Sequence, residues 1–248
     1  MIIIKSEYEI AIMREANRIL AQLFEHIRPM ILPGVSTIEL DKEAELFIRS
    51  HGALPAFKGY RDYPATLCTS VNDEVVHGIP GPRVLQSGDI ISIDVGALFD
   101  GFYSDAARTF PVGTISPQAK KLIEVTKESL DAGISQAVPG NHLSDISAAV
   151  QKVVEEGGFS VVRDFVGHGI GRNLHEAPQI PNFGRRGKGP ILQEGMTLAI
   201  EPMVNAGTYK VLIQSDGWTA VTEDASLSAH FENSIAVTKD GPVVLSAL

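Results

Sequence analysis

Four carboxylates lie in or beside apolar stretches of the chain, where an unpaired charge is costly. Asp94 interrupts the apolar run 90–96, Asp105 follows it closely, and Glu201 and Glu232 have similar surroundings in the second half. Burial of a carboxylate is unfavourable unless it is paired or binds a cation. Carboxylates that converge without a cation raise one another's pKa. Each residue alone would be an ordinary strand-end or turn residue, so the indication of a site comes from their number.

A histidine among glycines adds a nitrogen donor to this set. His168 lies between Gly167 and Gly169, and glycines permit a close approach of the backbone. Two divalent cations would balance the charge of the four carboxylates. Oxygen donors and one imidazole, without thiolates, suit Mn²⁺, Fe²⁺ or Co²⁺ at least as well as Zn²⁺. Two such cations about 3.5–4 Å apart can activate a shared water molecule, so the residues predict a dinuclear hydrolytic site.

Two further histidines are not needed as metal ligands. His77 and His175 each lie in a loop-like segment, and each alone would be an ordinary loop residue. Beside a dinuclear centre, an imidazole could bind a carbonyl oxygen or stabilise a tetrahedral oxyanion.

The elements that must position these side chains alternate between helical and extended patterns. Ser6 and Glu9 form a capping box ahead of a helix that ends near Pro29. Further helices are predicted over about 36–52, 116–138 and 144–157. Apolar runs predict strands at 66–71, 89–97, 102–112, 159–166, 197–205, 209–213, 219–222 and 231–238. A turn at Asp100-Gly101 predicts a hairpin that brings Asp94 beside Asp105.

The order of two helices and then several strands occurs twice. The segments 85–88 and 93–94 match 192–195 and 200–201 at a spacing of 107 residues. We therefore expect an α/β fold in one domain, 1–248, built from pseudo-repeats of about 1–112 and 113–248 around a pseudo-two-fold axis. A cleft between such halves is a natural ligand site.

Composition excludes several classes of protein. The 248 residues are 44% hydrophobic and 21% charged, which fits a globular domain rather than a disordered chain. A net charge of −9 opposes a dedicated nucleic-acid binder, and no apolar run approaches the roughly 18–20 residues of a membrane span. The single cysteine, Cys68, excludes an internal disulfide and a thiolate-rich zinc site. We expect a cytoplasmic protein with neither a membrane nor a nucleic-acid partner.

Together the motifs resemble those of the type I methionine aminopeptidases. His-Gly-Ile-Pro (77–80), two aspartate motifs (93–105), Gly-His-Gly-Ile-Gly and His-Glu (167–178), Ile-Glu-Pro-Met (200–203) and Phe-Glu (231–232) occur in that family's order and spacing. The resemblance covers essentially the whole chain. It implies the pita-bread fold, a short bacterial form and metal-dependent removal of the initiator methionine from nascent proteins and peptides, preferably before a small second residue. It also implies a monomer whose partners are its substrates, with transient contact at the ribosome as a further expectation.

The resemblance assigns roles to individual residues. It implies two divalent cations (Co²⁺, Mn²⁺, Fe²⁺ or Zn²⁺), with Asp105 and Glu232 bridging, and the ligands Asp94, Asp105, His168, Glu201 and Glu232. It implies that His77 and His175 contact the substrate and that Glu201 transfers protons. The methionine side chain would lie against Tyr60, Tyr63, Cys68, Leu174 and Trp218. Contacts between sulfur and aromatic rings stabilise a thioether by about 0.3–1.5 kcal/mol.

Four residues depart from the family pattern. Leu174 stands where Phe is common, Ala199 replaces a frequent Thr, and Asn233 and Ser234 stand where His-Thr is usual. None is an implied ligand, so the departures concern the shape of the pocket and the hydrogen bonding around the ligands. The alternatives are an Xaa-Pro aminopeptidase or dipeptidase of the same fold, and a weakly active or inactive paralogue that acts as a binding protein.

Overall fold

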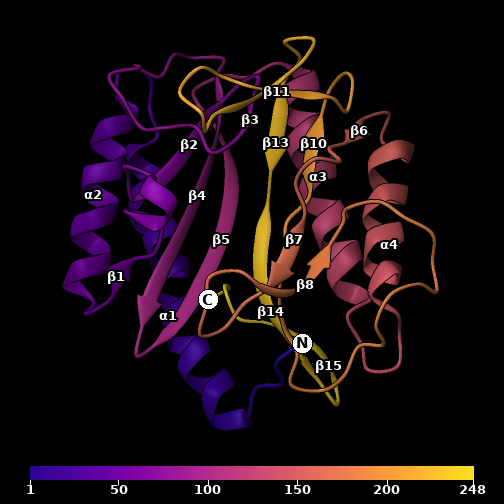
Figure 1. Ribbon diagram of the computed structural model, residues 1–248. Coiled ribbons are helices and arrows are strands. Elements are labelled where there is room, and N and C mark those ends of the chain that lie inside the picture. Colours follow the sequence, from indigo (N-terminus) through magenta and orange to yellow (C-terminus); the bar gives the residue numbers. More distant parts are fainter.

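Four long helices begin at the capping signals that the sequence contains. In the computed structural model, which describes residues 1–248, Ser6 and Glu9 exchange the two hydrogen bonds of a capping box at the start of α1 (Glu7–Ile27). The other helices are α2 (Thr37–Ser50), α3 (Pro117–Ser135) and α4 (Leu143–Glu156). The short 3₁₀ turns η1 (Arg28–Met30) and η2 (Tyr60–Asp62) complete the helical elements. All four predicted helices are confirmed (Figure 1).

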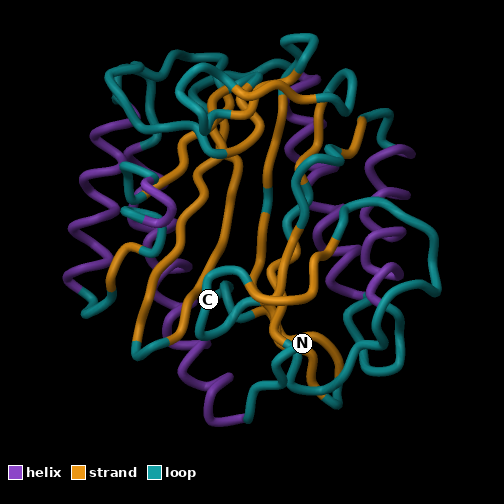
Figure 2. The backbone as a smooth tube through the Cα atoms, in the orientation of Figure 1, coloured by secondary structure: helices purple, strands orange, loops and turns teal.

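One large antiparallel sheet forms the centre of the molecule (Figure 2). Its strands follow the order β1-β4-β5-β14-β9-β7-β8, with β2 paired to β4 and β15 paired to β14. Their bounds are β1 (Leu54–Pro55), β2 (Leu67–Val71), β4 (Ile90–Phe99), β5 (Phe102–Pro111), β7 (Gly167–Gly169), β8 (Glu176–Ile180), β9 (Thr197–Ile200), β14 (Glu232–Thr238) and β15 (Gly241–Val244). Two three-stranded sheets comprise β13 (Ser228–His230), β10 (Met203–Asn205) and β6 (Ser160–Val161), and β11 (Val211–Ile213), β12 (Ala220–Thr222) and β3 (Glu74–Val76).

One predicted strand is interrupted and two others are shorter than predicted. The strand predicted over 197–205 breaks at Glu201-Pro202, and its second part, β10, pairs in a different sheet. Proline has no N–H to donate to a ladder, which favours the break. The segment predicted over 231–238 begins one residue later as β14, and 159–166 contains only the short β6. Strands β7 and β8 were not predicted because glycines and Pro178 dominate their sequence.

The helices cover one face of the large sheet and leave the other face to the candidate site. Ser104 on β5 donates to the carbonyl of Ala16 on α1, so its neighbour Asp105 points to the opposite face. In the second half, the Cγ2 atom of Ile200 on β9 lies near Gly133 of α3, and the adjacent Glu201 again points away. Figure 1 shows α1 and α2 beside β4 and β5, with α3 and α4 on the other flank of the sheet.

The same backbone contacts occur in both halves of the chain. In each half, a Pro-Gly turn and the residue after it are joined to a Leu-Gln segment. The matching N–H to carbonyl pairs are Gly34 to Leu85 and Gly140 to Leu192, Leu85 to Val35 and Leu192 to Asn141, and Gly88 to Val112 and Gly195 to Val237. Four of the five matched residue pairs are separated by about the 107-residue interval of the matching segments, and the fifth, Val112 and Val237, is further apart. None of the helices combines the length and apolar character that crossing a bilayer requires.

A buried ion pair attaches the N-terminal segment to the strand that follows His175. Lys5 Nζ lies 2.5 Å from Glu176 Oε2, and both side chains are 3% exposed. The other oxygen of Glu176 accepts a hydrogen bond from the backbone N–H of Asn173. The pair therefore holds the 171–176 segment against the N-terminus.

We predict that Lys5→Met destabilises the protein by about 3–5 kcal/mol, because it leaves the Glu176 carboxylate buried without its cationic partner. The exposed pair Arg18–Glu15 supplies a matched control, and Arg18→Met should cost less than about 1 kcal/mol. Urea denaturation measures both changes. Equal effects of the two substitutions would contradict the structural importance of the Lys5 pair.

Candidate metal centre

The register of the large sheet brings three carboxylates from distant parts of the sequence to one point. Asp94 on β4 pairs with Ala107 on β5, and Ala107 pairs with Glu232 on β14. Asp105 lies two residues before Ala107 and therefore on the same face. The predicted hairpin is confirmed, with Asp94 and Asp105 as diagonal rather than direct neighbours. The small side chain of Ala107 leaves room between the carboxylates.

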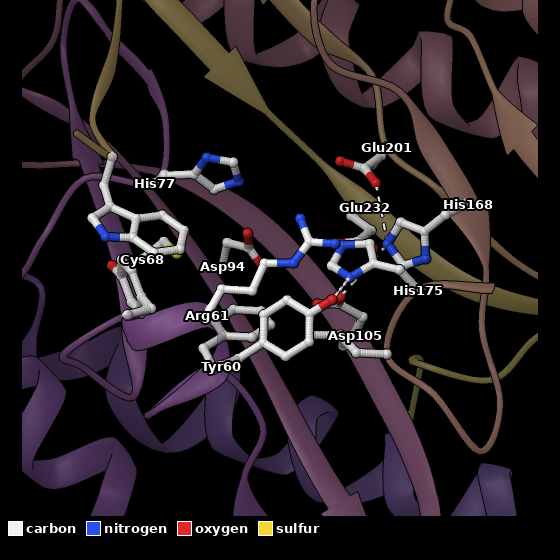
Figure 3. Close-up of a pocket in the computed structure, with 14 residues that line it drawn as sticks. Tyr60, Arg61, Cys68, His77, Asp94, Asp105, His168, His175, Glu201 and Glu232 are labelled. Carbon is white, nitrogen blue, oxygen red and sulfur yellow. Dashed lines mark hydrogen bonds and ion pairs between the residues drawn. The ribbon is translucent and has the colours of Figure 1, made fainter. Parts of the chain in front are cut away.

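The second half of the chain completes the cluster. His168 on β7 pairs with Ala199 on β9, and Glu201 follows β9 beside the start of β14. His168 Nε2 lies 3.4 Å from Glu201 Oε1 and 3.9 Å from Asp105 Oδ2. Ligand atoms of Asp105, His168 and Glu232 all lie within 4.8 Å of one another, and all three residues are buried. Figure 3 shows the five predicted ligand residues around one cavity.

The electrostatics of the cluster favour a cation. Burial raises the pKa of Asp94 to about 7. Burial and then the neighbouring carboxylates raise the pKa values of Asp105, Glu201 and Glu232 well above the ordinary range. One oxygen on each of Asp94, Asp105 and Glu232 is buried without a hydrogen-bond partner. Unpartnered carboxyl oxygens around an imidazole are a donor set that fits divalent cations, which would bind their ionised form.

Two histidines at the cavity each have a hydrogen-bond partner at Nδ1. Nδ1 of His168 lies 2.9 Å from the carbonyl of Gly169, which can only accept, so Nδ1 carries the proton and Nε2 offers a lone pair. Nδ1 of His175 lies 2.9 Å from the hydroxyl of Tyr60. If the hydroxyl donates, the proton of His175 is on Nε2. Burial lowers the pKa of His168 to about 4 and also lowers that of His175, so both rings are neutral near pH 7.

His77 lies on the other side of the cavity in a left-handed backbone conformation, with φ at 62°. Its ring packs edge-on against Phe165 and Trp218, with centroids 5.3 and 6.2 Å away. Burial lowers its pKa to about 4, which keeps this imidazole neutral. The sequence predicts a loop at His77, and the left-handed backbone conformation directs the His77 side chain from this loop into the site.

All five residues predicted for the methionine pocket line the cavity. Tyr63 is 2% exposed, and its ring packs edge-on against Trp218 at 5.0 Å. Cys68 pairs with Asp94 across β2 and β4, which places its buried thiol between the carboxylates and this aromatic wall. The remaining two predicted residues, Tyr60 and Leu174, lie with Phe57 and Arg61, which sequence reasoning missed.

The departures at Asn233 and Ser234 have defined partners. Arg108 donates to Asn233 Oδ1 at 2.7 Å and to the carbonyl of Glu232, so it holds the start of β14. Ser234 Oγ donates to the carbonyl of Asp105 and accepts from its N–H. Ala199 is fully buried between His168 and Ser234 in the ladder. These residues fix the backbone of the cluster, and none points an additional charge into it.

Sequence reasoning also missed His230, which ends β13. Its ring is buried, and Nε2 lies 3.7 Å from Glu201 Oε2. The signal was its position two residues before Glu232, because alternate residues of an extended segment share a face.

Comparisons with known proteins agree with this geometry. The sequence model of metallopeptidase family M24 matches residues 11–239 of this chain. A methionine aminopeptidase of Clostridium perfringens is 55% identical over 248 residues, which is all of both chains. The crystal structure of methionine aminopeptidase from Thermotoga maritima superimposes with a TM-score of 0.98 at 46% identity over the whole of both chains. The α/β pita-bread fold expected from the sequence is therefore confirmed.

A proline-specific relative is less similar. The structure of the prolidase from Pyrococcus horikoshii has a TM-score of 0.80 at 25% identity. The match covers 98% of this chain but only 63% of the prolidase.

We predict that the metal-free protein loses stability as the pH rises from about 6.5 to 8. Carboxyl groups with a raised pKa keep their protons in the folded state and lose them when the chain unfolds. Their stabilisation is therefore complete at low pH and is lost as the pH rises through the folded pKa, which is about 7 for Asp94. The buried histidines have lowered pKa values, so their contribution makes the protein more stable as the pH rises. This contribution changes only below the pKa of histidine in the unfolded chain, about 6.5.

Over this interval Asp94 alone accounts for about 1 kcal/mol, which corresponds to roughly 2–4 °C in Tm for a chain of this size. Saturating Mn²⁺ should abolish the decrease, since it binds the ionised carboxylates. Thermal unfolding of chelator-treated and Mn²⁺-loaded protein across the interval measures both curves. A metal-free Tm that stays constant or rises would show that the carboxylates are not packed together.

Proposed function

The chain belongs to metallopeptidase family M24, and we propose that it hydrolyses the peptide bond after an N-terminal methionine. The main support for this proposal is the cluster of four carboxylates and one neutral imidazole, which lies beside an aromatic pocket that suits a thioether side chain. Full-length similarity to methionine aminopeptidases supports the same substrate. The substrates would be peptides and nascent proteins that begin with methionine.

We propose that the cluster would hold two divalent cations, with Asp105 and Glu232 as ligands that both cations would share. The ligand set would be Asp94, Asp105, His168, Glu201 and Glu232. Two cations balance four carboxylates, and one buried oxygen on each of Asp94, Asp105 and Glu232 has no hydrogen-bond partner in the protein. Such a pair supplies a Lewis acid and lowers the pKa of a shared water molecule. The donor set is compatible with Co²⁺, Mn²⁺, Fe²⁺ or Zn²⁺.

The chain's own side chains would carry the remaining chemistry. With Tyr60 donating to Nδ1, His175 presents an Nε2–H that can donate to the substrate carbonyl and to the oxyanion formed from it. His77 presents a second neutral imidazole across the cavity and would hold the substrate backbone. Glu201, at the edge of the cluster and half-buried, would accept the proton of the attacking water and deliver it to the leaving amine.

The pocket beside the cluster supports methionine as the first residue. Tyr63 and Trp218 form an aromatic wall, and Cys68 and Leu174 add apolar surface. Burial raises the pKa of the Cys68 thiol well above its usual range, so this wall carries no thiolate. A thioether is stabilised by such aromatic contacts. We propose that the second residue of the substrate is preferably small, because His77 and His175 approach the scissile bond from two sides.

We propose that 1–248 forms a single catalytic domain whose pseudo-repeats are about 1–112 and 113–248. The hydrogen bonds that occur in equivalent places of both halves support a duplication. A monomer acting in the cytoplasm, where chains with an initiator methionine are made, with transient contact at the ribosome, completes the proposal.

We predict that the purified protein cleaves Met-Ala-Ser at least about 100-fold faster than an Ala-Pro peptide, a discrimination of roughly 3 kcal/mol. The reason is that the aromatic pocket accommodates a thioether side chain that alanine lacks. Cleavage should stop on chelation and return with Mn²⁺ or Co²⁺. Chromatographic assay of released methionine measures both effects. Faster cleavage of the Ala-Pro peptide would support an Xaa-Pro peptidase, and no cleavage of either peptide would support an inactive paralogue.

We predict that His168→Ala and Glu232→Ala abolish turnover and weaken cation binding, because each removes a donor from the cluster. His77→Ala should reduce kcat by about 10²–10⁴-fold while both cations remain bound, since loss of an acid–base or hydrogen-bonding group has effects of that size. Calorimetric titration with Mn²⁺ and peptide assays distinguish the two classes. Loss of cations from His77→Ala would mean that its role is misassigned.

A further inference from the structure

His230 has a buried polar atom that nothing in the protein satisfies. The residue is 2% exposed, and its Nε2 has no hydrogen-bond partner. A buried unsatisfied polar group costs about 1–3 kcal/mol. The nearest acidic atom is Glu201 Oε2, 3.7 Å away. The unsatisfied nitrogen therefore faces the residue to which we assign proton transfer.

The carboxylate of Glu201 lies between two imidazoles. Its Oε1 is 3.4 Å from His168 Nε2, and its Oε2 is 3.7 Å from His230 Nε2. Asn182 donates to the backbone carbonyl of Glu201 and not to its carboxylate. Because His168 Nδ1 carries the proton, His168 Nε2 cannot donate to Oε1. His230 is thus the imidazole that can donate a hydrogen bond to Glu201.

We propose that His230 is a positioning residue for Glu201, with Nε2–H donating to Oε2 so that Oε1 is turned toward the cation site and the attacking water. The proposal rests on the proposed role of Glu201. The observed 3.7 Å exceeds the roughly 3.2 Å limit of an N–H···O hydrogen bond, and a small rotation of the Glu201 carboxylate closes the difference. Nε2 can donate both in the neutral Nε2–H tautomer and in the imidazolium, so the contact requires no particular charge on the ring.

The backbone of His230 is fixed independently of its ring. Thr109 Oγ1 accepts from the His230 N–H at 2.9 Å and donates to its carbonyl at 2.8 Å. Ser92 Oγ lies 2.8 Å from the same Thr109 hydroxyl, and His230 also pairs with Met203 on β10. A change in the ring can therefore be tested while β13 stays in place.

The test compares His230→Leu, which removes the donor, with His230→Gln, which retains an amide N–H on a side chain of similar reach. We expect His230→Leu to lower kcat on Met-Ala-Ser about 10–100-fold, the usual range for losing a group that orients a metal ligand. KM and the number of Mn²⁺ ions bound in calorimetric titration should stay close to the wild-type values. His230→Gln should recover most of kcat.

Thr109→Val is the matched control, because it removes the side-chain anchor of β13 and leaves the His230 ring. It should lower Tm while retaining kcat within about threefold. In a Glu201→Gln background, the further change His230→Leu should have little additional effect on residual kcat, since both substitutions disturb one interaction.

Wild-type kcat in His230→Leu would overturn the proposal. Equal losses in the Leu and Gln variants, or an equal loss in Thr109→Val, would overturn it as well, because they would indicate displacement of β13. A wild-type protein that does not cleave Met-Ala-Ser would refute the proposed function and, with it, this role of His230. That outcome is distinct because it appears before any variant is compared.

Discussion

Repulsion among carboxylates that converge at one buried point is the constraint on which the rest of this structure depends. Asp105 and Glu232 are almost completely buried, and Asp94 and Glu201 border the same cavity. In the absence of cations such groups retain protons, as their raised pKa values indicate. A sheet that holds them together in spite of this cost is suited to bind cations, whose charge converts the repulsion into attraction.

Distant segments of the chain each contribute part of the carboxylate cluster. The β4–β5 hairpin carries two carboxylates, and β14 adds a third through its pairing with β5. Glu201 lies where the chain leaves β9 for another sheet, so its backbone is not paired in the β9 ladder. Since the helices of both halves cover the opposite face, the cluster opens to a cavity whose other walls are aromatic. Arg108 contributes no ligand atom, but its guanidinium donates a hydrogen bond to the backbone carbonyl of Glu232.

Much of this arrangement is predictable from the sequence because its signals are local. The capping residues define the helices, the Asp100-Gly101 turn defines the hairpin, and apolar surroundings mark the carboxylates. The order of the motifs then indicates the family, which similarity to M24 peptidases confirms. The assignment of ligand and substrate roles to individual residues stays a prediction that variants must test.

The parts that sequence reasoning missed depend on long-range geometry. The break at Glu201-Pro202 requires knowledge of which sheet accepts β10. The hydrogen bond between Tyr60 and His175 joins residues 115 positions apart. Arg61 enters the cavity from a turn with φ at 49°, which no local pattern indicates. His230 acquires meaning only from its distance to Glu201.

The most direct test of the central claim is a crystal structure of the protein grown with saturating Mn²⁺, with the ions located from their anomalous scattering. We expect two peaks about 3.5–4 Å apart, both inside the cavity that Asp94, Asp105, His168, Glu201 and Glu232 line. Absence of manganese from the cavity, or ions bound at other surfaces while the five side chains stay apart, would contradict it.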